Sequence, residues 1–117
     1  MGIVATKSFS FALEIIELYK FLSEAKKEYV LSKQVLRSGT AVGALIREAE
    51  HAQSKADFLH KMNIALKEAN ETEYWLTLLK ESNYIGTDHY QPLMASCKSI
   101  LRLLISIVHT TKTSLNR

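Results

Sequence analysis

The chain has 117 residues, the length of one ordinary domain, and a single hydrophobic core of that size needs no metal ion or disulfide. Its formal net charge is +3, a modest basic excess that permits nucleic-acid binding without requiring it. The single cysteine, Cys97, has no partner for an internal disulfide, and no N-terminal apolar stretch is long enough for a signal peptide or a membrane span. These features predict a cytoplasmic protein with no membrane partner.

The chain has only one proline and four glycines, so few residues interrupt its helices. Breaks between elements are expected near Glu28, Ser54 and Gly86. The whole chain, residues 1–117, is therefore predicted to be one domain of four helices, at about residues 9–27, 31–53, 55–82 and 88–113.

The predicted helix ends carry capping residues. Ser54, followed three residues later by Asp57, resembles a capping box with Asp in place of Glu. Asp88 is expected to cap the fourth helix, with Pro92 in its first turn. Short connections make neighbouring helices antiparallel.

Each predicted helix carries an apolar seam whose residues recur at alternating steps of three and four. In the first two helices the seam residues are Phe11, Ile15, Leu18, Leu22 and Ala25, then Leu31, Val35, Ser38, Val42, Leu45, Ala49 and Ala52. In the last two they are Phe58, Met62, Ala65, Ala69, Thr72, Leu76 and Leu79, then Leu93, Cys97, Ile100, Leu104, Ile107 and Thr111. Four such seams predict an all-α, antiparallel up-down-up-down four-helix bundle.

The second predicted helix is rich in small residues, namely Ser38, Gly39, Ala41, Gly43 and Ala44. Such residues weaken a helix in isolation but let another backbone approach closely. The pattern favours a close helix contact. The alternative is an intrinsically weak helix held only by its tertiary packing.

A second apolar stripe lies away from the seams. At about 100° per residue, Ile64, Trp75 and Leu78 fall together on the third helix, and Phe9 and Ile16 are similarly offset on the first. A bundle needs one stripe per helix, so this surplus favours a homo-oligomer, with Trp75 as the interface anchor. The alternative is that a broad core or the N-terminal tail covers these side chains.

Basic residues form two stripes with the same spacing, offsets of 4 and 14 residues, on the second and fourth helices. Each stripe is a candidate track for phosphates, and repetition in an oligomer would strengthen a weak footprint. The alternative is a solvated helix face. The RNA-binding candidates are Lys33, Arg37, Arg47, Lys98, Arg102 and Lys112.

Two pairs resemble the Glu-x-x-His spacing of di-iron bundles, Glu48 with His51 and Asp57 with His60. Both pairs fall off the seams and cluster at one turn, whereas such a centre needs inward ligands from all four helices. Cys97 lies on a seam, where a thiol behaves as a small hydrophobic side chain. The sequence therefore predicts no enzyme, no catalytic residues, no metal and no cofactor.

Three segments carry a family resemblance: Gln34-Val35-Leu36-Arg37-Ser38, Ile46-Arg47-Glu48-Ala49, and the block from Ala65 to Leu76. Together they resemble the bacterial four-helix-bundle proteins encoded in 23S rRNA intervening sequences. The resemblance extends from Phe11 to about Val108.

The resemblance implies a small all-helical protein that assembles as a homopentamer. It also favours association with structured RNA, because relatives are encoded within rRNA insertions. Similar bundles serve as accessory proteins of diversity-generating retroelements. The alternative function is therefore a protein-binding adaptor or an accessory subunit of a reverse transcriptase.

Overall fold

The computed structural model describes residues 2–116, which fold into four α-helices with no strand among them. The helices are α1 (Gly2–Glu24), α2 (Leu31–Glu50), α3 (Lys55–Glu81) and α4 (Thr87–Leu115). The prediction of an all-α chain of four helices is confirmed.

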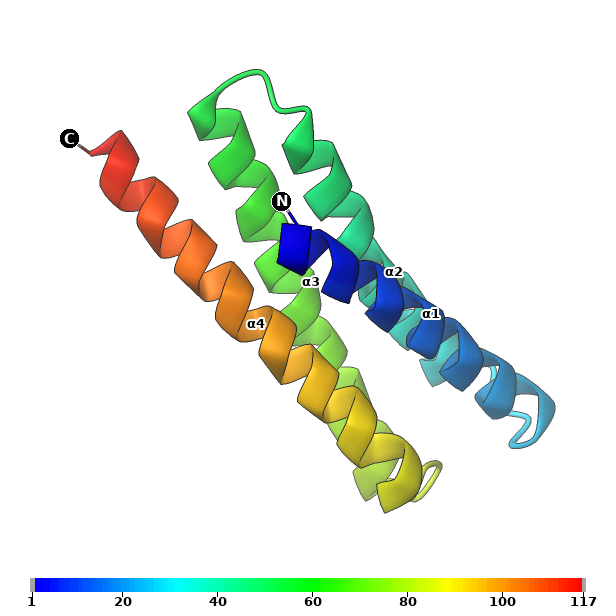
Figure 1. Cartoon of the computed structure of the whole chain (residues 1–117). Helices are drawn as coiled ribbons and strands as arrows, with labels where there is room; N and C mark the ends of the chain where they lie inside the picture. Colours follow the sequence, from blue (N-terminus) through cyan, green and yellow to red (C-terminus); the bar gives the residue numbers. More distant parts are fainter. Residues whose placement is uncertain (1, 117) are drawn as a thin grey trace.

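The helices form an elongated body with principal extents of 51 × 21 × 20 Å. α1 packs against α2 and α4, and α3 packs against the same two helices, while the backbones of the diagonal pairs stay apart. The loops 25–30 and 82–86 lie at one end of the body; the loop 51–54 lies at the other, near the C-terminal end of α4 (Figure 1).

The first helix begins at Gly2, earlier than the predicted start at residue 9. Val4 and Ser8 extend the seam of Phe11 by the same steps of four and three, and all three side chains are buried. The segment before residue 9 is therefore helical because it has a core face of its own. α1 ends at Glu24, before the predicted end at residue 27. The predicted seam residue Ala25 lies beyond this end and is exposed.

The predicted seams supply most of the core. Their buried members include Ile15 and Leu22 of α1, Val35 and Val42 of α2, Met62 and Leu76 of α3, and Ile100 and Leu104 of α4. Several seam residues, such as Phe58 and Ile107, are half-buried. The core also takes in Ile46, Met94, Leu101 and Val108, which lie beside the seams, and Ile85 of the loop 82–86.

The cap at the start of α3 is confirmed, and that of α4 is wrong. The Ser54 Oγ accepts a hydrogen bond from the Asp57 N–H at 3.0 Å, and the Asp57 carboxylate accepts one from the Gln53 N–H at 3.1 Å. α4 starts at Thr87 with Gly86 as its N-cap and no side-chain cap. Asp88 therefore lies inside the first turn, and Pro92 in the second.

The start of α2 is held by a side chain from the preceding loop. The buried Glu28 carboxylate accepts hydrogen bonds from the N–H groups of Val30, Leu31 and Ser32 at 3.2, 3.0 and 2.7 Å. These N–H groups have no partner within the helix. Lys27, with φ of 54°, turns the chain so that Glu28 reaches them.

By length and composition, α4 is apolar enough to cross a membrane, and no other helix within residues 2–116 is. A core helix of a bundle can meet the same criterion. Seven side chains of α4 are buried in this structure: Leu93, Met94, Cys97, Ile100, Leu101, Leu104 and Val108.

Candidate functional site

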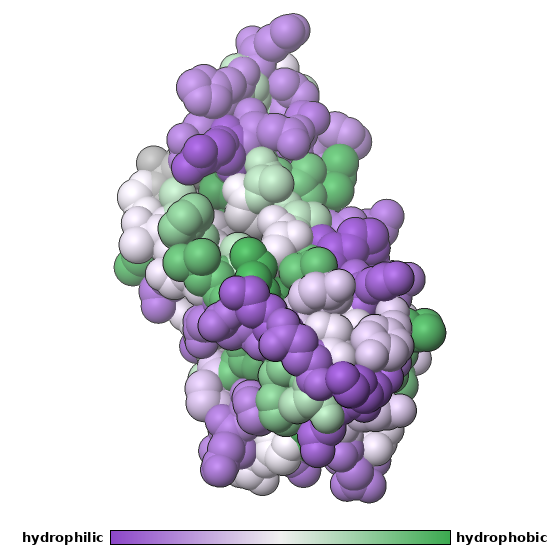
Figure 2. Space-filling model, turned by 90° about the vertical axis from the view of Figure 1, so that its right-hand side faces the viewer, coloured by the Kyte–Doolittle hydropathy of each residue, from purple (hydrophilic) through white to green (hydrophobic). Residues whose placement is uncertain are grey.

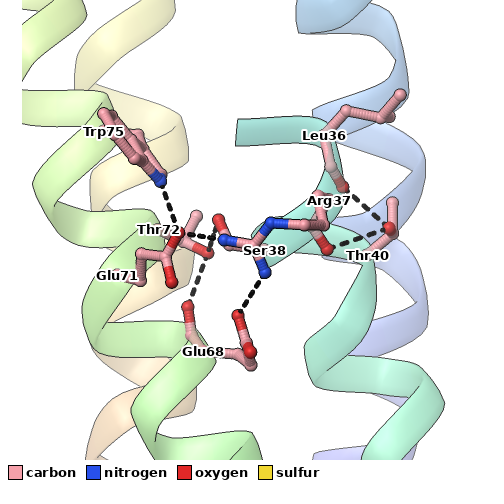
Figure 3. A network of polar contacts seen from close by, with 8 residues as sticks. All are labelled: Leu36, Arg37, Ser38, Thr40, Glu68, Glu71, Thr72 and Trp75. Atoms are coloured by element: carbon pink, nitrogen blue, oxygen red, sulfur yellow. Dashed lines mark hydrogen bonds and ion pairs between the residues drawn. The ribbon is translucent and has the colours of Figure 1, made fainter. Parts of the chain in front are cut away.

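A polar network joins the middle of α2 to α3 (Figure 3). The Arg37 guanidinium forms ion pairs with the carboxylates of Glu68, at 3.0 Å, and Glu71. Glu71 also accepts a hydrogen bond from the indole N–H of Trp75 at 2.8 Å. Arg37 and Trp75, predicted for two different surfaces, thus meet at the same carboxylate.

A hydroxyl pair lies beneath this network, in the core. The Ser38 and Thr72 side-chain oxygens are hydrogen-bonded at 2.9 Å, and the Thr72 hydroxyl also bonds the Glu68 carbonyl oxygen at 2.8 Å. Both side chains are fully buried, so each needs such a partner. The small Ser38 side chain lets α3 approach α2 closely enough to make the bond.

The small residues of α2 also form its contact with α1. An added Cβ on Gly39 would lie 2.8 Å from the Ile15 Cγ1, and one on Gly43 would lie 3.4 Å from the Ser8 carbonyl oxygen. Contacts this short require a residue without a side chain at Gly39. The predicted close helix contact is confirmed.

The predicted phosphate-binding residues fall into two groups. Arg37 is engaged by Glu68 and Glu71 of α3, so its charge is already paired within the subunit. The other five are exposed, and none makes an ion pair with residues 2–116; they are Lys33, Arg47, Lys98, Arg102 and Lys112. The two stripes lie on α2 and α4, which are diagonal in the bundle, so they form two separate patches.

The predicted interface residues Ile64, Trp75 and Leu78 are all half-buried on α3. The most exposed large hydrophobic side chain of this helix is Tyr74, which is 59% exposed and lies edge-on to the Trp75 ring, with the ring centroids 5.1 Å apart. The sequence analysis missed Tyr74. The same helical wheel would have found it, because Tyr74 lies nearly opposite the α3 seam.

Exposed apolar side chains also lie on α1. Phe9 is 59% exposed and Leu13 is 52% exposed. Phe9 lines a groove of about 380 Å³ between α1 and α2, whose lining also includes Gly43, Arg47 and Glu50. Figure 2 shows the face that lies to the right in Figure 1, where hydrophobic patches are interrupted by hydrophilic side chains and the upper end is hydrophilic.

The side chains considered for catalysis have other partners. Glu48 forms an ion pair with Lys61 at 3.1 Å, and Asp57 serves the cap of α3. Residues 2–116 contain no group of three or more His, Cys, Asp or Glu side chains that could hold a metal ion.

Cys97 is buried, with its Sγ 3.5 Å from the Ala69 carbonyl oxygen. Burial, together with the smaller effect of the Glu73 carboxylate and against the opposing effect of Lys98, raises the pKa of this thiol to about 12. The neutral thiol is a poor nucleophile at ordinary pH.

These observations define a small all-α protein of four helices. The family model of the 23S rRNA-intervening sequence protein matches residues 2–106, and the chain belongs to that family.

A solved structure supports the assignment. The chain is similar to a protein of unknown function from the S23 ribosomal protein family of Bacteroides thetaiotaomicron VPI-5482, with 57% identity and a TM-score of 0.89. The match covers 91% of this chain and 98% of the other. The comparison with curated proteins gave no match.

Proposed function

We propose that this protein is a non-enzymatic homo-oligomer that associates with structured RNA through exposed basic helix faces, in the cytoplasm and without a cofactor. The observation that carries the proposal is the stripe of Lys98, Arg102 and Lys112 on α4. All three side chains are exposed and free of ion pairs within residues 2–116, and α4 has no acidic residue after Asp88.

Such a stripe binds a nucleic-acid backbone by displacing its condensed counterions. Three contacts give a weak footprint, and Lys33 and Arg47 add a second patch on α2. An oligomer would present each patch several times and so raise the overall affinity without new contacts. Arg37 is left out of the proposal because its charge is already neutralised by two carboxylates.

The proposed subunit is an antiparallel up-down-up-down bundle. Support comes from the short loops, 25–30, 51–54 and 82–86, and from the packing of each helix against two neighbours. The proposed assembly is a homopentamer, which is what the family resemblance implies. The family name places the relatives' genes in 23S rRNA insertions, which supports RNA as the ligand class.

The test compares two double variants with the same change in charge. Lys98→Glu with Arg102→Glu should lower the affinity for a labelled structured RNA at least about tenfold at low salt, as measured by fluorescence anisotropy. Lys26→Glu with Lys27→Glu, in the loop after α1, is the matched control and should have a much smaller effect.

Equal losses in the two variants would show that only net charge matters and would overturn the assignment to α4. A wild-type protein that is oligomeric but does not bind RNA would favour the alternative, a protein-binding adaptor such as an accessory subunit of a reverse transcriptase.

A further inference from the structure

A lysine of α1 joins the basic stripe of α4. The exposed Lys7 donates a hydrogen bond from its Nζ to the Ser99 Oγ at 3.2 Å. Ser99 follows Lys98 directly and lies one turn before Arg102, so this bond holds the Lys7 ammonium near both cations. The sequence analysis missed Lys7, because a helical wheel does not place one helix beside another.

The parts of α1 and α4 that carry these cations have no acidic residue. α1 has no Asp or Glu before Glu14, and α4 has none after Asp88. Two carboxylates border the region, Glu14 in the α1–α4 crevice and Glu73 of α3 near Cys97, and neither forms an ion pair with any cation of residues 2–116. The cations therefore form one basic surface, the α1–α4 face, which consists of Lys7, Lys98, Arg102 and Lys112.

The cations of α4 lie at the two ends of this face. At about 1.5 Å per residue, Lys98 and Arg102 are about 6 Å apart along the helix, and Lys112 lies about 15 Å beyond Arg102. At about 100° per residue, the three side chains stay within about 80° of one another around the helix. The exposed residues in the gap between Arg102 and Lys112 on this face are Ile105, Ser106 and His109.

The α1–α4 face offers no aromatic ring on which a base could stack. α4 has no Phe, Tyr or Trp after Tyr90. On the first half of α1, Phe9 lines the groove toward α2 and Phe11 is buried. Sites for single-stranded RNA stack unpaired bases on exposed aromatic side chains. The face is therefore suited to a phosphate backbone whose bases are already paired.

We propose that the α1–α4 face binds double-stranded RNA across its minor groove, with Lys7 as a further phosphate contact. The minor groove of an A-form duplex is wide and shallow, is bordered by the phosphates of both strands and displays 2′-hydroxyl groups. A duplex also has a denser phosphate charge than a single strand, which strengthens binding to a face of this kind. The inference rests on the proposed function and specifies the form of RNA that is bound.

Each part of the face has its own role in this arrangement. The cluster of Lys7, Lys98 and Arg102 contacts phosphates on one side of the groove, and Lys112 contacts the opposite strand. Ser106 and His109 lie in the gap between them and face the 2′-hydroxyl groups, with which a hydroxyl and an imidazole can exchange hydrogen bonds. A DNA duplex lacks those groups, so the gap favours RNA.

The first test compares three ligands by fluorescence anisotropy. They are a blunt RNA duplex of about 20 base pairs, one of its two strands, and a DNA duplex of the same sequence. At low salt the wild-type protein should bind the RNA duplex at least about tenfold more tightly than either of the others. An equal or higher affinity for the single strand, or an equal affinity for the DNA duplex, would overturn the inference.

The second test removes the charge of Lys7. Lys7→Gln should weaken binding to the RNA duplex and reduce the slope of log affinity against log salt by about 1 for each subunit in contact with it. Lys20→Gln, further along α1 at a lysine already paired with Glu17, is the matched control and should keep the wild-type slope. If the two variants have the same slope, Lys7 is not a phosphate contact.

The third test concerns the gap. The double variant Ser106→Ala with His109→Ala keeps every cation of the face, so it should keep the salt slope but lose most of the preference for RNA over DNA. An unchanged preference would show that the gap does not face the 2′-hydroxyl groups. Far-ultraviolet circular dichroism should show unchanged helicity in all the variants.

The outcomes also separate this inference from the proposed function. A protein that prefers the single strand, and loses that binding on Lys98→Glu with Arg102→Glu, overturns the inference but leaves the proposed function standing. A wild-type protein that binds none of the three ligands overturns both.

Discussion

Gly39 and Gly43 occupy similar positions on α2 but are expected to respond differently to a methyl group. Gly39→Ala would press its Cβ against Ile15, whose branched side chain has little freedom to move, and should lower the free energy of unfolding by about 1–3 kcal/mol. Gly43→Ala meets only ordinary contacts and gains helix propensity, so it should be neutral or stabilising by up to about 1 kcal/mol.

Urea unfolding of the two glycine variants beside the wild type checks this pair. A Gly39→Ala variant as stable as the wild type would show that α1 and α2 can separate without cost.

The single cysteine gives a pH-dependent prediction. The pKa of Cys97 is raised from 9.0 to about 12 by burial, so the unfolded thiol loses its proton at lower pH than the folded one. The folded state therefore binds more protons between these values, and stability should fall as the pH rises from about 9 toward 12. Cys97→Ala should flatten this slope in urea unfolding measured from pH 8 to pH 10.5.

The same burial should protect the thiol from alkylation. At pH 8, iodoacetamide should modify Cys97 at least about a hundredfold more slowly in native protein than in urea. Rapid modification of the native protein would mean that α3 and α4 open readily around this residue.

At the scale of the element, the apolar seams made the helices predictable. The alternation of three and four steps gave the number of helices and their core faces, because burial in a bundle follows that period. The ends were less predictable. The first helix starts at Gly2 because Val4 and Ser8 continue its seam, a pattern too short to stand out in the sequence.

Glu28 caps α2 in a way that no capping rule indicates. It lies two residues before the N-cap Val30, and the turn at Lys27 is needed to bring its carboxylate to three N–H groups. Glu28→Ala should lower the free energy of unfolding by about 1–2 kcal/mol, in the range of a lost N-cap.

Glu24→Ala, which removes an exposed carboxylate near the end of α1, serves as the control for Glu28→Ala. Equal stability of the two variants, measured by urea unfolding, would show that the hydrogen bonds of Glu28 contribute nothing net.

At the scale of the whole molecule, the sequence located the exposed surfaces less well than the core. A helical wheel describes one helix at a time, so it could not show that Glu68 and Glu71 of α3 would neutralise Arg37 of α2. The helical wheel likewise placed Trp75 in a surface stripe but could not show that its indole N–H bonds the Glu71 carboxylate. The stripe on α4 is free of this difficulty, because its three basic residues have no ion-pair partner within residues 2–116.

The central claim is that this bundle associates with structured RNA. Fluorescence anisotropy of a labelled structured RNA, titrated with nuclease-treated protein across a salt series, tests it most directly beside a DNA duplex of equal length. The account predicts that the protein binds RNA at low salt more tightly than it binds the DNA duplex. The logarithm of the binding constant should fall linearly with the logarithm of the salt concentration. Absence of binding at low salt would contradict it.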